Sequence, residues 1–342
     1  MRVTISDREI VEKSAAVGAR RLRVGVAGLG VVGGGAALEL IGEAARYELC
    51  AVLVRDREKP RAPELDGVRK YTDVGVFLSE GPDVIIDALP CGDAGRVLIE
   101  RALEQGVSVV SANKQAVFGS LARFHRLAAD NKAAFAYSAS VGGGAPMVET
   151  VRKARSAGEI KSLTAIVNGA VNYILTLVGS GVSFDEAVAR AQAAGFAEPD
   201  PAADLSGDDA RAKASILAFE AFGVEIAADK IEVEALDAAR ADHIVRDGRA
   251  WRQLTRIEKL DRGVAARIAY ECVDGDGFFR AVRDEGNALR VVNATGADFT
   301  CADKGAGRGP TVRSLFADLE AIHTAAADGA QEISLKNPPP LS

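Results

Sequence analysis

Short apolar runs alternate with amphipathic stretches along the first part of the chain. The runs are rich in Val, Ile, Leu and Ala, and their length suits strands that are buried on both faces of a parallel sheet. We expect such strands at 22–27, 48–54, 83–89, 107–111 and 134–137. The stretches between them predict helices at 34–44, 73–79, 95–105 and 114–131. This alternation predicts an α/β fold with a Rossmann-type, doubly wound parallel sheet.

The pattern changes after about residue 141, where a glycine-rich turn at 142–144 leads into a helix that ends near 156. Further strands are expected at 161–167, 253–258, 265–272 and 289–293. Further helices are expected at 173–179, 184–194, 208–222 and 311–323. This order predicts a second, α+β domain with a mixed sheet. A chain of 342 residues also suggests two domains, at roughly 100–200 residues per domain.

A Gly-x-Gly-x-x-Gly motif lies between the first predicted strand and the helix that follows it. In this context Gly28 permits a tight turn, Gly30 lets the backbone approach a pyrophosphate, and Gly33 lets the helix pack closely on the strand. The helix N-terminus offers free N–H groups and the positive end of its dipole to phosphates. We therefore predict an NAD or NADP site made by Gly28, Leu29, Gly30, Val31, Val32 and Gly33.

Arg55 and Asp56 follow the second predicted strand, at the position that usually contacts the adenosine ribose. An acidic residue there binds the 2′-hydroxyl of NAD, whereas an arginine accommodates the 2′-phosphate of NADP. Both residue types are present, and Lys59 and Arg61 follow closely. We favour NADP, with Arg55 as a ligand, and keep NAD as the alternative.

Composition and charge exclude several classes of function. The 42 basic and 48 acidic side chains give a net charge of -6, without the clustered basic surface of a nucleic-acid-binding protein. No apolar run reaches the roughly 18–20 residues that span a bilayer, and residues 1–20 resemble neither a signal peptide nor a transit peptide. The four cysteines form no Cys-x-x-Cys pair, which suits a reducing compartment. We expect a cytoplasmic protein with an N-terminal extension, 1–20, and a tail, 326–342.

The densest polar cluster extends from residue 195 to Lys213. Asp209 and Lys213 are four residues apart on the predicted helix 208–222 and therefore share one of its faces. Lys114 follows the strand 107–111, at the carboxyl edge of the sheet where α/β folds bind their ligands. With the dinucleotide motif upstream, the polar cluster indicates a candidate substrate site, and Lys114 could contact both the nicotinamide and the substrate; an ordinary lysine at a helix start is the alternative for Lys114. An exposed ion pair of little energetic consequence is the common alternative for Asp209 and Lys213.

The chain resembles the homoserine dehydrogenase family from about residue 23 to residue 319. The matching segments come in the family's order and spacing, and they include the glycine motif and the polar cluster. They are 26–33, 112–114, 140–146, 168–169, 172–176, Glu198-Pro199-Asp200-Pro201, Asp204, Gly207, Asp209, Lys213, 305–307 and 310–311.

The resemblance implies reversible oxidation of L-homoserine to L-aspartate 4-semialdehyde with NAD(P)+, a step of threonine and methionine biosynthesis. It implies catalytic roles for Lys213 and Lys114, with Lys114 also contacting the cofactor. The implied substrate-binding residues are Glu198, Asp204, Asp209 and Gly169. A lysine would then take up the hydroxyl proton. A second lysine lowers its pKa and nearby carboxylates raise it, so the direction of the net shift stays open at this point.

The resemblance also implies a sodium ion, held largely by backbone carbonyls of Ser138, Val141, Gly143 and Ala145. Oxygen ligands suit such a hard cation. It further implies a homodimer formed through the second domain. The expected layout is a dinucleotide-binding domain at 21–145, to which the last helix, 310–325, returns, and a substrate-binding and dimerisation domain at 146–309. Since the chain ends before any C-terminal ACT domain, we expect no feedback inhibition through such a domain.

Several positions depart from the family's usual residues. Ala170 and Val171 follow Gly169 where the family usually has threonine after this glycine, Phe196 replaces a tyrosine, and Ser138 replaces a glutamate. A site that loses hydroxyl groups near its substrate loses part of its discrimination. The first alternative is therefore a related dehydrogenase that acts on another small hydroxy or amino acid.

Two further alternatives belong to other classes of protein. A non-catalytic NADP-binding sensor would be expected to lose Lys114 or Lys213, and both are present. A phosphorylating semialdehyde dehydrogenase would need a cysteine nucleophile with a partner base. Cys91 lies in a suitable turn, but no histidine has an evident connection to it in the sequence; the three histidines are His125, His243 and His323.

Overall fold

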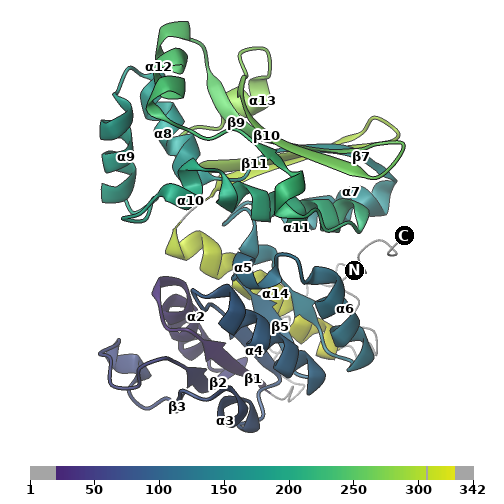
Figure 1. Cartoon of the computed structure of the whole chain (residues 1–342). Coiled ribbons are helices and arrows are strands. Elements are labelled where there is room, and N and C mark those ends of the chain that lie inside the picture. The colour runs from purple at the N-terminus through teal and green to yellow at the C-terminus, as the bar shows by residue number, and fades with distance from the viewer. Residues whose placement is uncertain (1–20, 306, 328–342) are drawn as a thin grey trace, which may run out of the picture.

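The computed structural model describes residues 21–305 and 307–327. These residues form two halves, each built on a six-stranded sheet (Figure 1). The predicted extension, 1–20, and the part of the predicted tail beyond residue 327 lie outside the described residues.

The sheet of the first half is parallel throughout and has the order β3-β2-β1-β4-β5-β6. Its strands are β1 (Leu22–Ala27), β2 (Tyr47–Leu53), β3 (Lys70–Tyr71), β4 (Val84–Asp87), β5 (Ser108–Ser111) and β6 (Phe135–Ala136). The chain winds outward from β1 in both directions, so the sheet is doubly wound. This confirms the predicted Rossmann-type α/β fold.

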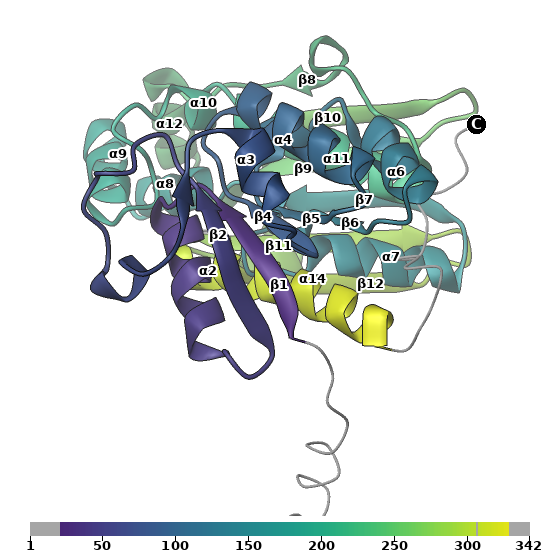
Figure 2. The same cartoon turned by 90° about the horizontal axis from the view of Figure 1, so that it is seen from below.

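Helices cover both faces of this sheet. Successive residues of a strand point to opposite faces, and apolar side chains on both faces need to be buried. On one face, Val24 and Val26 pack with α2 (Val31–Gly42) and α14 (Arg308–Ala327). On the other face, Ile85 packs with the helices α3 (Val74–Ser79), α4 (Gly92–Glu104) and α6 (Leu121–Asp130). Figure 2 shows the sheet between these two groups of helices.

The second sheet has the order β12-β11-β7-β9-β10-β8 and is mixed, since β10 and β8 pair in parallel while its other pairs are antiparallel. Its strands are β7 (Ile160–Ile166), β8 (Glu232–Val233), β9 (Trp251–Lys259), β10 (Val264–Cys272), β11 (Gly286–Asn293) and β12 (Asp298–Lys304). Helices α7 (Met147–Ala157) and α11 (Asp208–Phe222) pack on one face. Helices α8 (Gly169–Gly179), α9 (Phe184–Ala193) and α12 (Ala238–Asp247) form a separate apolar cluster. The predicted second α+β unit with a mixed sheet is confirmed.

The helices differ from the predicted ones in several places. The single helix predicted at 114–131 is wrong: α5 (Lys114–Val117) and α6 are separate, and Gly119 lies between them with a φ of 71°, which residues with a side chain rarely adopt. Helix α8 begins four residues before the predicted start at 173. The short helices α10 (Ala202–Leu205) and α13 (Gly277–Ala281) and the helix α12 were not predicted. No helix among the described residues is long and apolar enough to cross a membrane.

The last helix, α14, packs on the first sheet although it follows the second sheet in the sequence. Leu315, Leu319 and Ile322 are buried in the same core as Val24 and Val26. The chain therefore crosses between the halves twice, once after β6 and once before α14 (Figure 1). The boundaries of the two domains at 145 and 309 stay predictions.

Because Leu315 is fully buried, we expect Leu315→Ala to lower the free energy of unfolding by about 2–5 kcal/mol. Urea unfolding of both proteins would measure this loss. Leu260→Ala is the matched control, since Leu260 is 50% exposed, and it should change stability by no more than about 0.5 kcal/mol. Equal, small losses in both variants would show that α14 is not part of the core of the first half.

Candidate active site

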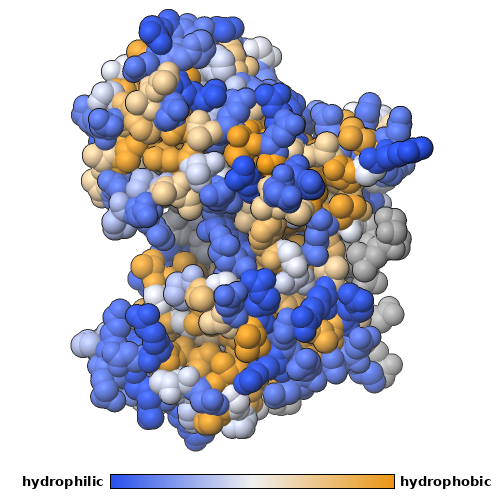
Figure 3. Space-filling view, viewed as in Figure 1, coloured by the Kyte–Doolittle hydropathy of each residue, from blue (hydrophilic) through white to orange (hydrophobic). Residues whose placement is uncertain are grey.

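A pocket of about 280 Å³ lies where the two halves meet. Lys114 and Gln115 line it from the first half, and residues of α8, α10 and α11 line it from the second. Figure 3 shows that the molecular surface is hollowed between the two halves. The pocket brings together six of the predicted site residues: Lys114, Gly169, Glu198, Asp204, Asp209 and Lys213.

The end of β5 and the start of α5 position Lys114. Asn113 caps α5, with its side-chain oxygen accepting a hydrogen bond from the N–H of Ala116 at 3.2 Å. The Asn113 amide also donates to the carbonyl of Cys91 at 3.1 Å, and the Asn113 N–H donates to Ser111 Oγ at 3.1 Å. The strand end and the helix start are therefore held together, and Lys114 extends from them toward the second half.

Asp209 connects the two lysines. Its Oδ1 lies 2.8 Å from Nζ of Lys114, and its Oδ2 lies 2.7 Å from Nζ of Lys213. Asp209 and Lys213 are one turn apart on α11, as their spacing predicts. Helix α11 starts after Gly207, whose φ of 82° and close approach to Val233 leave no room for a side chain. The pair is not an exposed ion pair, because only 7% of the Asp209 side chain and 15% of the Lys213 side chain is exposed.

These contacts fix the charge of the central groups. Burial alone would raise the pKa of Asp209, but the ammonium groups of Lys213 and Lys114 lower it to about 2. Burial alone would lower the pKa of Lys114, but the carboxylate of Asp209 outweighs it, so the pKa of Lys114 is raised above its ordinary value. The net pKa shift of Lys114, whose direction the sequence left open, is therefore upward. Both lysines contact a carboxylate that is ionised at neutral pH.

Asn168 belongs to this group, although the sequence analysis did not select it as a site residue. Its Nδ2 donates to Asp204 at 2.8 Å and to Asp209 at 3.0 Å. Its Oδ1 accepts the N–H of Val171 at 2.9 Å, so the same side chain caps α8. Asparagine before a helix is a recognisable capping signal. The signal was missed because the helix was expected to begin only at residue 173.

The other predicted substrate-binding residues line the same pocket. Asp204 is half-buried, and this burial raises its pKa even though Asn168 donates to it. Glu198 is exposed at the rim, and the carbonyls of Glu198 and Pro199 accept hydrogen bonds from Gln192 at 3.2 and 3.0 Å. Gly169 is buried against the carbonyl of Glu285, which a Cβ at residue 169 would approach to 2.7 Å. The pocket therefore offers anionic oxygens beside two ammonium groups.

The glycine motif has the shape that a dinucleotide pyrophosphate requires. Gly28 has a φ of 87°, and a Cβ on Gly33 would come within 1.9 Å of the Gly28 carbonyl oxygen. Gly30, in contrast, faces open space, with no atom within 4 Å of a Cβ built on it. The first turn of α2 has no side-chain cap at Gly30, so its N–H groups are available to phosphate oxygens. Leu29 and Val32 pack against the core, while Val31 is 73% exposed. The glycine geometry and the free N–H groups together fit a bound NAD(P).

Arg55 and Asp56 differ in how free their side chains are. Arg55 is exposed just after β2 and has no hydrogen-bond or ion-pair partner among the described residues. The Asp56 carboxylate accepts the N–H of Glu58 at 2.9 Å, and Arg61 donates to backbone carbonyls of the same loop. An unpaired guanidinium remains available to an anion at this position, whereas the carboxylate is engaged by its own loop.

The segment predicted to hold sodium forms a 3₁₀ turn, η2 (Ser138–Ser140), and the loop that follows it. The carbonyl of Ser138 accepts the N–H of Val141 at 3.2 Å, and the carbonyl of Ala145 accepts the N–H of Met147 at 2.7 Å. The carbonyl of Gly143 accepts the hydroxyl of Ser314. Three of the four predicted ligands thus already accept a hydrogen bond within the protein. No cluster of three or more histidine, cysteine or acidic side chains in the described part of the chain could hold a metal ion.

Two family models match the chain. The model described as homoserine dehydrogenase matches residues 146–319, and the model described as homoserine dehydrogenase, NAD binding domain, matches residues 28–138. The NAD(+)-dependent homoserine dehydrogenase of Pseudomonas canavaninivorans is 31% identical over 254 residues, which cover 72% of this chain and 72% of that protein. The homoserine dehydrogenase of Pseudomonas aeruginosa is 30% identical over 311 residues, which cover 87% of this chain and 71% of that protein.

Solved structures show the same fold. A homoserine dehydrogenase from Thiobacillus denitrificans superposes with a TM-score of 0.81 at 25% identity, covering 93% of this chain and 76% of that one. A hyperthermophilic archaeal homoserine dehydrogenase in complex with NADPH superposes with a TM-score of 0.76 at 23% identity, covering 89% of this chain and 98% of that one. With both family models matched in order and two relatives covered over most of their length, this chain belongs to the homoserine dehydrogenase family.

Proposed function

We propose that this chain interconverts L-homoserine and L-aspartate 4-semialdehyde by NAD(P)-dependent oxidation and reduction at a CH–OH group. The observation that carries the proposal is the pair of ammonium groups, Lys114 and Lys213, which share the buried carboxylate of Asp209 in the pocket between the halves. The choice of substrate rests on family membership, and the charged pocket contains groups that could bind such a substrate.

The carboxylates recognise the amino end of the substrate. Glu198 and Asp204 line the pocket from the second half with carboxylate oxygens, and an α-ammonium group would pair with them. Asp209 already accepts two ammonium groups and an amide, so its main role is to hold both lysines in place. The homoserine hydroxyl then meets the lysines while its ammonium group meets the acids.

The lysines handle the proton of the reacting oxygen. The glycine motif would hold NAD(P)+, which would supply the acceptor for the hydride of the carbinol carbon. Lys213 also donates to the carbonyl of Val167 at 2.9 Å, so part of its hydrogen-bonding capacity is fixed by the backbone. Lys114 is 35% exposed and bonds only to Asp209 among the described residues, which leaves two of its three protons free for the substrate. We assign proton transfer to Lys114 and stabilisation of the developing alkoxide to Lys213.

A second candidate substrate is favoured by the two changed pocket residues. Ala170 and Phe196 line the pocket, and neither carries the hydroxyl that the family usually has there. The Phe196 ring lies 5.0 Å from the ring of Tyr173 and so packs as an apolar side chain. The alternative is therefore the same reaction on another small hydroxy or amino acid.

The finer assignments form part of the same proposal. The unpaired Arg55 favours NADP over NAD.

The face of the second sheet opposite α7 and α11 carries Thr164, Arg256 and Thr300, which remain at least partly exposed and suit a homodimer contact. Free cysteines throughout the described part of the chain agree with a cytoplasmic location. The sodium site stays a prediction, and no step of the mechanism depends on it.

Initial rates of nicotinamide reduction with L-homoserine test the proposed activity, with an expected kcat of roughly 1–10³ s⁻¹. Lys213→Ala should lower kcat by about 10²–10³-fold, because it removes the cation that stabilises the developing negative charge. Its affinity for the dinucleotide should stay within about twofold of the wild type. Lys153→Ala, at an exposed lysine of α7, is the matched control and should behave as the wild type. Tight dinucleotide binding without homoserine turnover would favour the alternative substrate, and a fully active Lys213→Ala would refute the role of Lys213.

Asp209→Asn should shift the pH dependence of homoserine oxidation. Oxidation needs a lysine that has lost its proton, so the rate should rise with pH in the wild type. Because Asp209 raises the pKa of Lys114, its neutralisation should move the rising limb of kcat/KM to lower pH by about one unit or more. Asp208→Asn is the control, since the Asp208 side chain is 59% exposed and pairs with Arg211. An unshifted profile for Asp209→Asn would mean that Lys114 is not the titrating group.

Arg55→Ala should raise the KM for NADP+ by about tenfold or more, since it removes a charged hydrogen bond worth about 1.5–3 kcal/mol. The KM for NAD+ should not change, because NAD lacks the 2′-phosphate. Arg57→Ala removes a neighbouring exposed guanidinium and serves as the control. Similar changes for both dinucleotides would show that Arg55 does not read the 2′-phosphate.

A further inference from the structure

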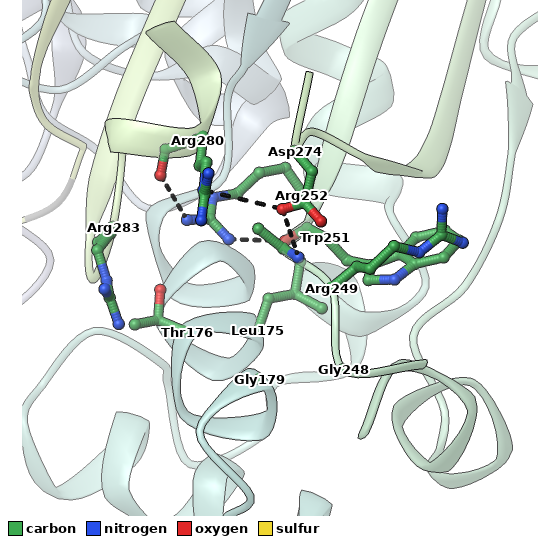
Figure 4. A pocket seen from close by; sticks show the side chains of 11 residues that line it. Leu175, Thr176, Gly179, Gly248, Arg249, Trp251, Arg252, Asp274, Arg280 and Arg283 are labelled. Carbon is green, nitrogen blue, oxygen red and sulfur yellow. Dashed lines mark hydrogen bonds and ion pairs between the residues drawn. The ribbon is translucent and has the colours of Figure 1, made fainter. Parts of the chain in front are cut away.

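A second cavity, of about 290 Å³, lies within the second half of the molecule. It is formed by the C-terminal half of α8, the start of β9 and the segment around α13 (Figure 4). Its charged and polar lining consists mainly of Arg249, Arg252, Arg280, Arg283, Asp274 and Thr176. None of these residues lines the active-site pocket.

The cavity has an excess of positive charge. Asp274 is the only acid among the described residues that line it, and its carboxylate lies 3.8 Å from the Arg280 guanidinium and accepts the N–H of Ala250 at 3.2 Å. Arg252 is 5% exposed and has no carboxylate at ion-pair distance among the described residues. Its guanidinium donates instead to the carbonyls of Val282, Trp251 and Arg280. A buried cation that is bonded only to neutral acceptors retains its full charge toward the cavity.

Arg283 strengthens this excess. Its guanidinium has no hydrogen-bond or ion-pair partner in the described part of the chain, and it lies with Arg252 and Arg280 on the side of the cavity near Thr176 (Figure 4). Arg249 lies apart from these three, beside the Trp251 ring, and pairs with Asp247 at 2.7 Å. Burial lowers the pKa of Arg252, and the charge of Arg283 lowers it further. Arg252 and Arg283 have no carboxylate partner among the described residues, and Arg280 has only Asp274, at 3.8 Å. The three guanidinium groups therefore repel each other, and a bound anion would reduce that repulsion.

The cavity and the active site share structural elements. Helix α8 contributes Thr176 and Gly179 to the cavity, while Gly169 and Ala170 of its first turn line the active-site pocket. The loop 282–286, which carries Arg283, is tied to α8 because Asn172 Nδ2 donates to the carbonyls of Asp284 and Gly286 at 3.0 and 3.2 Å.

The same loop touches the active site directly. The carbonyl of Glu285 accepts the N–H of Gly305 at 2.7 Å and packs against Gly169. Both glycines line the active-site pocket. Arg283 therefore lies two residues from a contact with the wall of that pocket.

We propose that this arginine cavity binds a small multivalent oxyanion and that binding alters the active-site pocket through the loop 282–286 and α8. The ligand carries phosphate or paired carboxylate groups, because guanidinium groups bind the oxygens of both in a bidentate manner. The cavity is at the small end of ligand pockets, which limits the ligand to a compact metabolite. The binding part of the proposal is independent of the dehydrogenase activity proposed above.

Calorimetry with pyrophosphate and, separately, citrate tests the binding. The protein is saturated with NADP+ so that the glycine motif is filled, and ionic strength is kept constant. At least one probe should bind the wild type, and Arg280→Ala/Arg283→Ala should weaken that binding at least tenfold. Arg262→Ala, at an exposed arginine of the β9–β10 turn, should bind as the wild type. Arg252 is not replaced, because its loss would also release the carbonyls of Val282 and Arg280.

The identity of the probe that binds distinguishes a phosphate-bearing ligand from a carboxylate-bearing one. Equal affinity in the double variant, or no binding of either probe, would overturn the proposal. Amide hydrogen exchange tests the coupling without requiring turnover: exchange at 284–286 and Gly305 should slow by about fivefold or more when the probe binds, within the usual range of coupling between sites. Unchanged exchange in a probe-bound wild type would overturn the coupling. A failure of the proposed dehydrogenase activity would leave both readouts intact.

Discussion

The site depends on one buried carboxylate. Asp209 is 5% exposed, and a charge in such a place is costly unless ionic and hydrogen-bonding partners surround it. Lys213, Lys114 and Asn168 provide these partners. Because Lys114 comes from the first half and the others from the second, the cost of burying Asp209 is fully offset only when the two halves are correctly joined. The geometry of the candidate site and the contact between the halves therefore depend on each other.

Helix α11 contacts the first half near both of its ends, through Asp209 and through Glu220. Glu220 follows Asp209 by three turns and so lies on the same side of the helix. Its buried carboxylate pairs with Arg152 of α7 at 2.8 Å and accepts the hydroxyl of Tyr137, which follows β6 of the first half. His125 of α6 stacks on Phe219, and burial lowers its pKa to about 4. A neutral imidazole at this contact therefore adds no charge beside Glu220 near neutral pH.

The sequence predicts the fold well where hydrophobic periodicity is strong, and it predicts the site well where residues are close along the chain. Five of the six parallel strands, the glycine motif and the Asp209–Lys213 pair follow from local pattern alone, whereas the two-residue strand β3 was not predicted. The break at Gly119 and the edge strand β12 do not, because the first is a backbone conformation and the second exposes most of its residues. The contact between Lys114 and Asp209 could be established only from the fold, since the two residues are far apart in sequence. The sign of its pKa shift likewise required the observed distances.

The side chains of Ala170 and Phe196 fall outside the network that holds the lysines. Asp209 contacts Lys114, Lys213 and Asn168, and none of these contacts involves Ala170 or Phe196. Ala170 is 4% exposed in the first turn of α8, where its methyl group packs into the apolar cluster with Val171 and Ile174. The loss of these two hydroxyl groups therefore leaves the contacts among Asp209, Lys114, Lys213 and Asn168 unchanged. Under the proposed function, hydride transfer would be retained, and Ala170 and Phe196 would affect the length and polarity of the substrate that the pocket accepts.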